Sequence, residues 1–201
     1  ESAGVRKGYW GWASCAADFN NDGYLDIFHV NGMDEPATNA YLDDPSRLFI
    51  NNGDGSFTEY AEPLGLVDRR MGRGVTCFDG DKDGDVDILV ANSGDTVKLY
   101  RNDGGNQLNF LNVELRYSGP NTRAIGARVY VTVGNATQFR EIHNGNNFVS
   151  QNPAEQHFGM NEATRAESVR VTWPDGSETT RNNISVNQRL TVTYPDSWSS
   201  D

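Results

Sequence analysis

Hydrophobic and polar residues alternate strictly in four segments of the second half of the chain. This pattern is typical of a β-strand with one face in a core and the other in water. The apolar positions are Leu111, Val113, Leu115 and Tyr117, then Val129, Val131 and Val133, then Val169, Val171 and Trp173, and finally Leu190, Val192 and Tyr194. Four such strands between turns predict a compact β-sandwich.

Turn signals separate these strands and recur throughout the chain. Glycine occurs 21 times in 201 residues, with turn sequences such as Asn52-Gly53, Gly134-Asn135 and Pro174-Asp175-Gly176. Helical periodicity is scarce. The sequence therefore predicts an all-β protein.

The first half contains an internal repeat. The stretch DFNNDGYLDIF begins at Asp18 and returns 61 residues later in DGDKDGDVDILV, which begins at Asp79. The flanks repeat as well, because RLFINNGDG after the first stretch is echoed by KLYRNDGG after the second. Such a repeat indicates one supersecondary unit that has been copied.

Each copy carries the oxygen ligands of a calcium loop. Alternate side chains can converge on one ion if the backbone turns sharply at a glycine, here Gly23 or Gly84, and Ca²⁺ takes six to eight oxygens. We expect the carbonyl at loop position 7 to complete each shell, so that two Ca²⁺ ions are bound. The predicted ligands are Asp18, Asn20, Asp22, Tyr24 and Asp26 in loop one, and Asp79, Asp81, Asp83, Asp85 and Asp87 in loop two.

Two other interpretations of these loops fit the sequence less well. A single copy could be a solvated turn rich in Asp and Asn, but two copies at the same spacing favour a metal. An EF-hand needs a bidentate Glu at position 12, where this chain has His29 or Val90. Both loops run into short β-rich segments, so the metal is expected to staple a turn between strands.

The residues also resemble known families. The two loops with their following hairpins resemble FG-GAP/VCBS repeats, the calcium-loop blades of integrin-type β-propellers. The segments NFLNVELR, IGARVYVTV, QFREIHNGNNFVSQNPAEQHFGM and SVRVTWPDGSET resemble the ASPIC/UnbV domain in that order. Together they resemble the C-terminal region of cartilage acidic protein-like polypeptides. This resemblance implies an extracellular context and assigns no chemistry to the second domain.

The expected organisation follows from these segments. We predict two calcium-binding repeats within residues 1–107 (about 10–60 and 70–107), an ASPIC/UnbV-like β-sandwich at 108–195, and a tail at 196–201. A propeller needs about four blades to close, so two four-stranded units stay open. Their edges are covered by the second domain or by another chain, and residues 1–9 are a candidate strand for insertion into a neighbouring copy.

Cys15 and Cys77 lie at nearly equivalent positions of the two repeats. They either form a disulfide, which an oxidising compartment favours, or remain two buried thiols. Asn135 and Asn183 begin glycosylation sequons. Both observations are consistent with a secreted, periplasmic or cell-surface protein, which is the location we predict.

The net charge and the lack of catalytic motifs limit the classes of function that this sequence suggests. A net charge of −11 disfavours nucleic acid as a partner, and no apolar run reaches the length that spans a bilayer. The three histidines, His29, His143 and His157, match no catalytic motif, so no enzyme activity is expected. Arg69, Arg70 and Arg73 either bind an anionic glycan or protein partner or lie in a solvated loop.

These observations predict a secreted, calcium-binding structural or adhesive protein. It is expected to assemble with other copies of itself into an extracellular filament through open sheet edges, or to bind other extracellular proteins or glycans. The alternative is that the chain is a fragment of a longer propeller protein that serves as an accessory or sensor domain of an enzyme or receptor.

Overall fold

The computed structural model describes residues 3–33, 41–195 and 197–200. Within these residues the chain is built from β-strands and one short 3-10 helix, η1 (Gly105–Gln107). The strands form four open sheets, and none of the sheets formed by the described residues closes into a barrel. The prediction of an all-β protein is confirmed.

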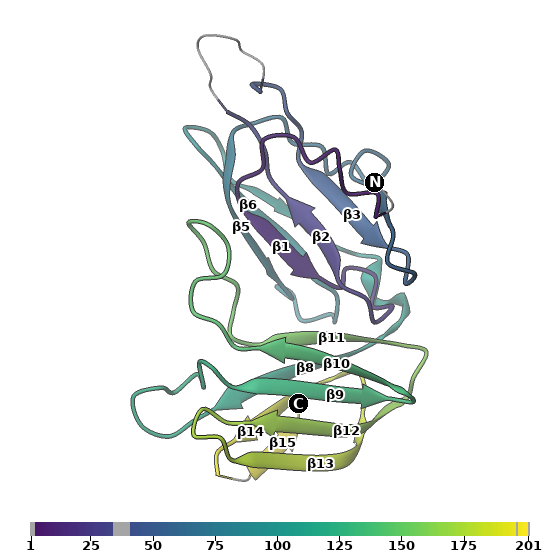
Figure 1. Ribbon diagram of the computed structural model, residues 1–201, viewed down its shortest axis with the longest axis vertical. Helices are drawn as coiled ribbons and strands as arrows, with labels where there is room; N and C mark the ends of the chain where they lie inside the picture. Colours follow the sequence, from purple (N-terminus) through teal and green to yellow (C-terminus); the bar gives the residue numbers. More distant parts are fainter. Residues whose placement is uncertain (1–2, 34–40, 196, 201) are drawn as a thin grey trace.

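The first half holds two sheets whose strands follow chain order (Figure 1). The first sheet consists of β1 (Ser14–Ala17), β2 (Asp26–His29), β3 (Arg47–Asn51) and β4 (Phe57–Glu59). The second consists of β5 (Gly72–Phe78), β6 (Asp87–Asn92) and β7 (Lys98–Tyr100). The expectation of two four-stranded units is wrong for the second copy, because the chain leaves β7 through η1 and joins the other half.

Both sheets contribute to one buried cluster. Its larger members include Phe28 and Leu48 from the first sheet and Val75, Ile88 and Val90 from the second. A disulfide between Cys15 of β1 and Cys77 of β5 joins the sheets, with the two Cα atoms 6.4 Å apart. Of the two alternatives for the cysteines, the structure therefore shows the bond.

The second half holds the other two sheets, with strand orders β11-β8-β14-β15 and β10-β9-β12-β13. Strand β14 runs parallel to β8, and the other pairs are antiparallel. The strands are β8 (Asn109–Arg116), β9 (Arg128–Val133), β10 (Ala136–Glu141), β11 (Gln156–Asn161), β12 (Arg165–Thr172), β13 (Glu178–Ser185), β14 (Gln188–Thr193) and β15 (Ser197–Ser200). The segment expected to be a tail thus contributes β15, although residues 196 and 201 lie outside the described chain.

The alternating apolar residues of the second half meet in one core between these two sheets. Val131, Val171 and Val192 are fully buried there, as is most of Trp173. The indole Nε1–H of Trp173 donates a 2.7 Å hydrogen bond to Thr179, so that its polar atom is satisfied in the apolar interior. The alternation predicted these strands and the side that each one buries.

Strand β8 departs from the expected pattern on its polar side. Asn112 was expected to face water, yet only 1% of its surface is exposed. Strands β8 and β11 lie along the boundary between the halves (Figure 1), and the loops of the first half cover this face. Its polar side chains therefore serve an interface.

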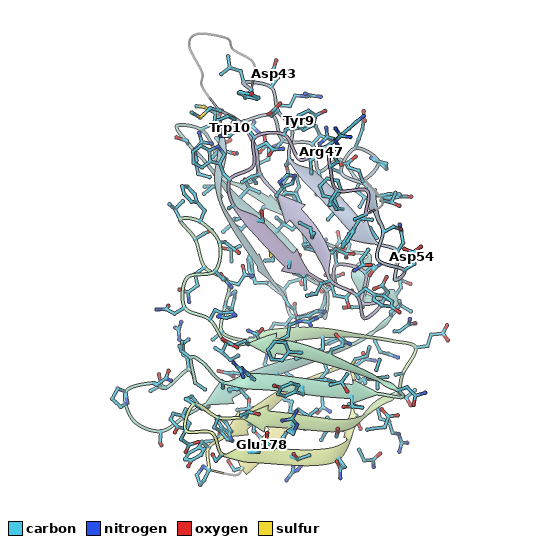
Figure 2. All side chains as sticks on the ribbon, in the orientation of Figure 1. Tyr9, Trp10, Asp43, Arg47, Asp54 and Glu178 are labelled. Carbon is cyan, nitrogen blue, oxygen red and sulfur yellow. A yellow bond between two sulfur atoms is a disulfide. The ribbon has the colours of Figure 1, made fainter. Side chains whose placement is uncertain are left out.

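The N-terminal segment packs on its own first sheet. The N–H of Phe57 donates to the carbonyl of Ala3 at 2.8 Å, and the guanidinium of Arg47 lies 4.5 Å from the centre of the Tyr9 ring (Figure 2). Residues 3–9 form no strand, and residues 1–2 of the proposed inserted strand lie outside the described chain. Residues 3–9 therefore pack against the first sheet of their own chain.

Candidate metal centres

The two predicted metal loops have the same backbone shape. Each connects the first two strands of its sheet, β1 to β2 in loop one and β5 to β6 in loop two. Gly23 and Gly84, at position 6, have φ angles of 95° and 98°. Asn21 and Lys82, at position 4, also have positive φ, at 60° and 67°. The sequence predicted the glycine turn but not the second residue with positive φ. Asn adopts this left-handed conformation more readily than Lys.

Loop two brings three carboxylates together. Oxygens of Asp79, Asp81 and Asp83 all lie within 4.8 Å of one another. The Asp79 Oδ1 atom is buried without a hydrogen bond of ordinary geometry. Burial raises the pKa of Asp79, whereas hydrogen bonding from Asn112 and from the backbone N–H groups of Gly84 and Lys82 lowers it. Three clustered carboxylates and one orphaned oxygen fit a hard divalent cation, which would offset their mutual repulsion.

Loop one is held together by hydrogen bonds among its predicted ligands. The N–H of Asp22 donates to Asp18 Oδ1 at 3.1 Å and to Asn20 Oδ1 at 3.2 Å. The N–H of Gly23 donates to Asp18 Oδ2 at 2.8 Å. Asp18 is almost fully buried, and burial is the main reason that its pKa rises to about 7. Asn20 Nδ2 also donates to Asp22 Oδ2 at 2.9 Å, so the position-1, -3 and -5 side chains gather around the same turn, with one fewer carboxylate than in loop two.

The position-9 acids have a structural role that the sequence analysis missed. Asp26 accepts the N–H of Phe19 at 3.0 Å and the N–H of Asn51 at 2.8 Å. Asp87 does the same with Gly80, at 3.0 Å, and with Asn102, at 2.8 Å. Each carboxylate thus ties the start of its loop to the end of the second strand after that loop, β3 in the first sheet and β7 in the second. Each oxygen keeps a second lone pair, so this role is compatible with binding a cation.

The position-7 residues were predicted to act through their backbone carbonyls, which stays a prediction. Their side chains differ in environment. Tyr24 is half-exposed and its ring lies close to Gly53. Asp85 is fully buried, and its Oδ2 accepts the N–H of Gly105 at 3.1 Å.

Both loops dock on the second half through a buried polar network. Asn112 of β8 donates from Nδ2 to Asp79 Oδ2 at 2.9 Å, and its Oδ1 lies 2.7 Å from His157 Nδ1. The other ring nitrogen of His157 lies 2.6 Å from Oδ1 of Asn21 in loop one. The Asn21 amide in turn donates to the carbonyl of Gly84 in loop two at 2.9 Å. One chain of contacts therefore connects both loops to β8 and β11.

Burial and the nearby Arg140 lower the pKa of His157 to about 3, so the ring is neutral at pH 7. A neutral imidazole donates from one nitrogen only. Both neighbouring amides present an oxygen to the ring, so the network lacks one donor at His157. In this position His157 is a structural polar residue that joins β8 to loop one.

A second contact between the halves involves the loop from β10 to β11, which rises beside the first half in Figure 1. Ser150 Oγ accepts the N–H of Val75 at 3.0 Å, and Asn152 Oδ1 accepts the N–H of Cys77 at 3.0 Å. Asn147 Nδ2 donates to the Val75 carbonyl at 2.8 Å. These side chains form hydrogen bonds with backbone groups at the edge of β5 that no described strand pairs with. The second half thus covers one of the open edges, as one of the two expectations had it.

The other candidate residues lie apart from the loops. Arg70 forms salt bridges with Asp68 and Asp95, at 3.1 and 3.2 Å. Arg73 stacks on Trp12 at 4.2 Å, and Arg69 donates to a backbone carbonyl at 2.8 Å. The basic cluster is therefore engaged within the chain.

The two sequons, at Asn135 and Asn183, are exposed. Glycosylation at both stays a prediction. In the described part of the chain, no helix has the length and apolar character that crossing a bilayer requires.

Comparison with known proteins yields two family matches. The family described as ASPIC and UnbV matches residues 117–198, and the family described as FG-GAP-like repeat matches residues 37–90. The second match includes loop two and not loop one.

Curated relatives align with most of the chain. Cartilage acidic protein 1 of Homo sapiens is 32% identical over 197 residues, which is 89% of this chain and 27% of the relative. The protein of that name from Xenopus tropicalis is 31% identical over 198 residues, 90% of this chain and 28% of the relative. The chain thus spans less than a third of the length of the curated relatives it matches.

Proposed function

Because the chain carries an FG-GAP-like repeat and an ASPIC/UnbV domain and is distantly similar to cartilage acidic protein 1, we propose that it is a secreted calcium-binding protein. Its role is structural or adhesive rather than catalytic. The two sheets of the first half act as propeller-like blades, each with a calcium loop, and the second half is a β-sandwich packed against them.

The observation that carries the proposal is the convergence of carboxylates in a duplicated loop. Asp79, Asp81 and Asp83 lie within 4.8 Å of one another, and loop one repeats the same turns. Two bound Ca²⁺ ions would change the formal charge from −11 to −7. Loop two is the tighter site because four of its ligand side chains are carboxylates, against three in loop one.

Secretion is supported by the disulfide. Disulfides such as Cys15–Cys77 persist in oxidising compartments and are rare in the cytosol. The exposed sequons at Asn135 and Asn183 are compatible with such a route.

Self-assembly is proposed at the outer edge of β7. Among the described strands, none pairs with this edge. In the first sheet, the equivalent edge of β3 is paired with a fourth strand, β4. Val97 and Leu99 beside it are each 61% exposed. Open edges accept strands from other chains, and a head-to-tail contact that does not close builds a filament. Other extracellular proteins or glycans are the further candidate partners.

The alternative proposal is an accessory or sensor domain in a longer polypeptide. It is supported by the fraction of the curated relatives that the chain spans, 27–28%. In that case the β7 edge would be filled by another segment of the same polypeptide.

Calorimetry tests the calcium proposal. Binding to the folded state alone stabilises it by about 2.7 kcal/mol for each site at a free calcium concentration 100 times Kd. We expect chelator to lower the melting temperature, and Asp81→Asn combined with Asp83→Asn to abolish the share of this difference that comes from loop two. Asp54→Asn, at an exposed carboxylate of the hairpin between β3 and β4 that is not a predicted ligand (Figure 2), is the matched control. Identical melting curves in chelator and in millimolar calcium would exclude the proposal.

Sedimentation in calcium tests the assembly. Leu99→Lys should dissociate filaments, because a charge at an open edge opposes strand addition. Val149→Lys, at a residue 68% exposed in the loop from β10 to β11, should leave them intact. If the unmodified chain stays monomeric at high concentration, assembly through the β7 edge is wrong.

A further inference from the structure

We propose that the second half of the chain positions the metal ligands of the first half, with Asn112 as the positioning residue of loop two. This inference rests on the proposed calcium binding. It gives the second half of the chain a role at a metal site, although that half contributes no predicted ligand of its own.

The two oxygens of Asp79 have different surroundings. Asn112 holds Oδ2 through its 2.9 Å hydrogen bond, while Oδ1 is buried without such a partner. A carboxylate held at one oxygen has its rotation fixed, and the other oxygen is left to face the ion. Hydrogen-bonded partners of metal ligands orient the ligands in this way.

Asn112 is itself held in place. It is 1% exposed and lies within β8, so its backbone is fixed by pairing with β11 and β14. The contact between its Oδ1 and His157 sets the direction of the amide. The donor therefore comes from a rigid sheet rather than from a mobile surface.

The same sheet presses on both loops. The N–H of Asn161 in β11 donates to the carbonyl of Asn21 in loop one at 2.8 Å. A Cβ on Gly84 would lie 2.0 Å from the ring of Phe110 in β8, so loop two lies directly against this strand. Neither loop can change shape without disturbing the contact between the halves.

An ion can still reach these carboxylates. A cavity of about 630 Å³ lies between the halves, and Asp18, Asp79 and Asn112 all line it. The first ligand of each loop therefore faces the same opening beside the second half.

Calcium titration calorimetry on the full chain tests the inference. Asp22→Ala disables loop one, so that binding reports on loop two. In this background, Asn112→Ala should weaken calcium binding by about 10–100-fold, the usual effect of removing an outer-shell partner. Asn112→Leu, which keeps most of the volume, should do the same. Circular dichroism of each variant establishes that it is folded.

Asn152→Ala is the matched control. It also removes an interface asparagine of the second half, but Asn152 contacts the β5 edge rather than a loop ligand. We expect its calcium affinity to stay within about threefold of the background chain, since no group that orients a loop ligand is lost.

The outcomes separate the two proposals. If the background chain binds no calcium, the proposed function fails at loop two. If it binds calcium and the Asn112 variants bind equally well, the positioning role is wrong while calcium binding stands. Equal weakening by the Asn112 and Asn152 variants would also overturn the positioning role, because the effect would then come from docking in general.

Discussion

Replacing Gly159 with alanine tests the contact between loop one and β11. A Cβ at this position would lie 2.0 Å from Asp18 Oδ2 and 2.6 Å from the backbone of Asn21. Neither neighbour can move freely. Asp18 Oδ2 accepts the N–H of Gly23, and the Asn21 carbonyl accepts the N–H of Asn161, both at 2.8 Å.

The expected cost can be estimated in two ways. If the contact stays closed, an inserted methyl group in a well-packed site costs about 1–3 kcal/mol. If the loop moves away, the hydrogen bonds of Asn21 to Asn161 and His157 are lost, at about 1 kcal/mol each or more when a buried partner is left unsatisfied. Both routes predict that Gly159→Ala lowers the free energy of unfolding by about 2–3 kcal/mol.

Urea unfolding in chelator measures this loss without a contribution from calcium. Gly104→Ala is the control, because its Cβ would meet no heavy atom closer than 3.9 Å. Its midpoint should stay near that of the unmodified chain. If Gly159→Ala changes the free energy of unfolding by less than about 0.5 kcal/mol, the usual range of a neutral surface substitution, loop one does not press on β11 as described.

Three further predictions address the disulfide, a position-9 acid and the buried histidine. Replacing Cys15 and Cys77 with serine should cost about 4 kcal/mol in thermal unfolding, because the bond closes a loop with a sequence separation of 62; a loss below about 1 kcal/mol would contradict this. Asp26→Asn should cost about 1–3 kcal/mol even in chelator, because the new amide cannot accept both backbone N–H groups; unchanged stability in urea would show that the acid serves the metal alone. The pKa of His157 is lowered to about 3 in the folded chain, so below about pH 6.5 the unfolded chain binds a proton that the folded chain does not. The free energy of unfolding of the unmodified chain, relative to that of His157→Gln, should therefore fall by about 1.4 kcal/mol for each pH unit below 6.5. A flat difference for His157→Gln would refute its neutral burial.

Local patterns predicted the strands well because burial on one side of a sheet leaves a period of two in the sequence. Val131 and Val171 illustrate this, since each faces the core and its sequence neighbours do not. The sharp turns at the glycines of the metal loops could also be predicted from the sequence, because the conformation that glycine allows is a local property.

The contact between the halves was not predictable in the same way. Asn112 looks like the polar side of a half-exposed strand, and nothing next to it in the sequence indicates that Asp79 lies 2.9 Å away. The missing fourth strand of the second sheet is a similar case. The sequence after β7 resembles that of the hairpin after β3, but the residues that follow, from Asn109, pair with β11 and β14 instead.

The buried network also bears on the order in which the chain folds. His157 and Asn21 are 136 residues apart, whereas all the described strand pairs of the first half and three of the six in the second half join consecutive strands. Contacts between distant residues form late because closing a long loop costs entropy before the contact forms. We therefore expect the two cores to form first and the network to close after the transition state. Substitutions at Asn112 or His157 would then accelerate unfolding and leave the folding rate nearly unchanged.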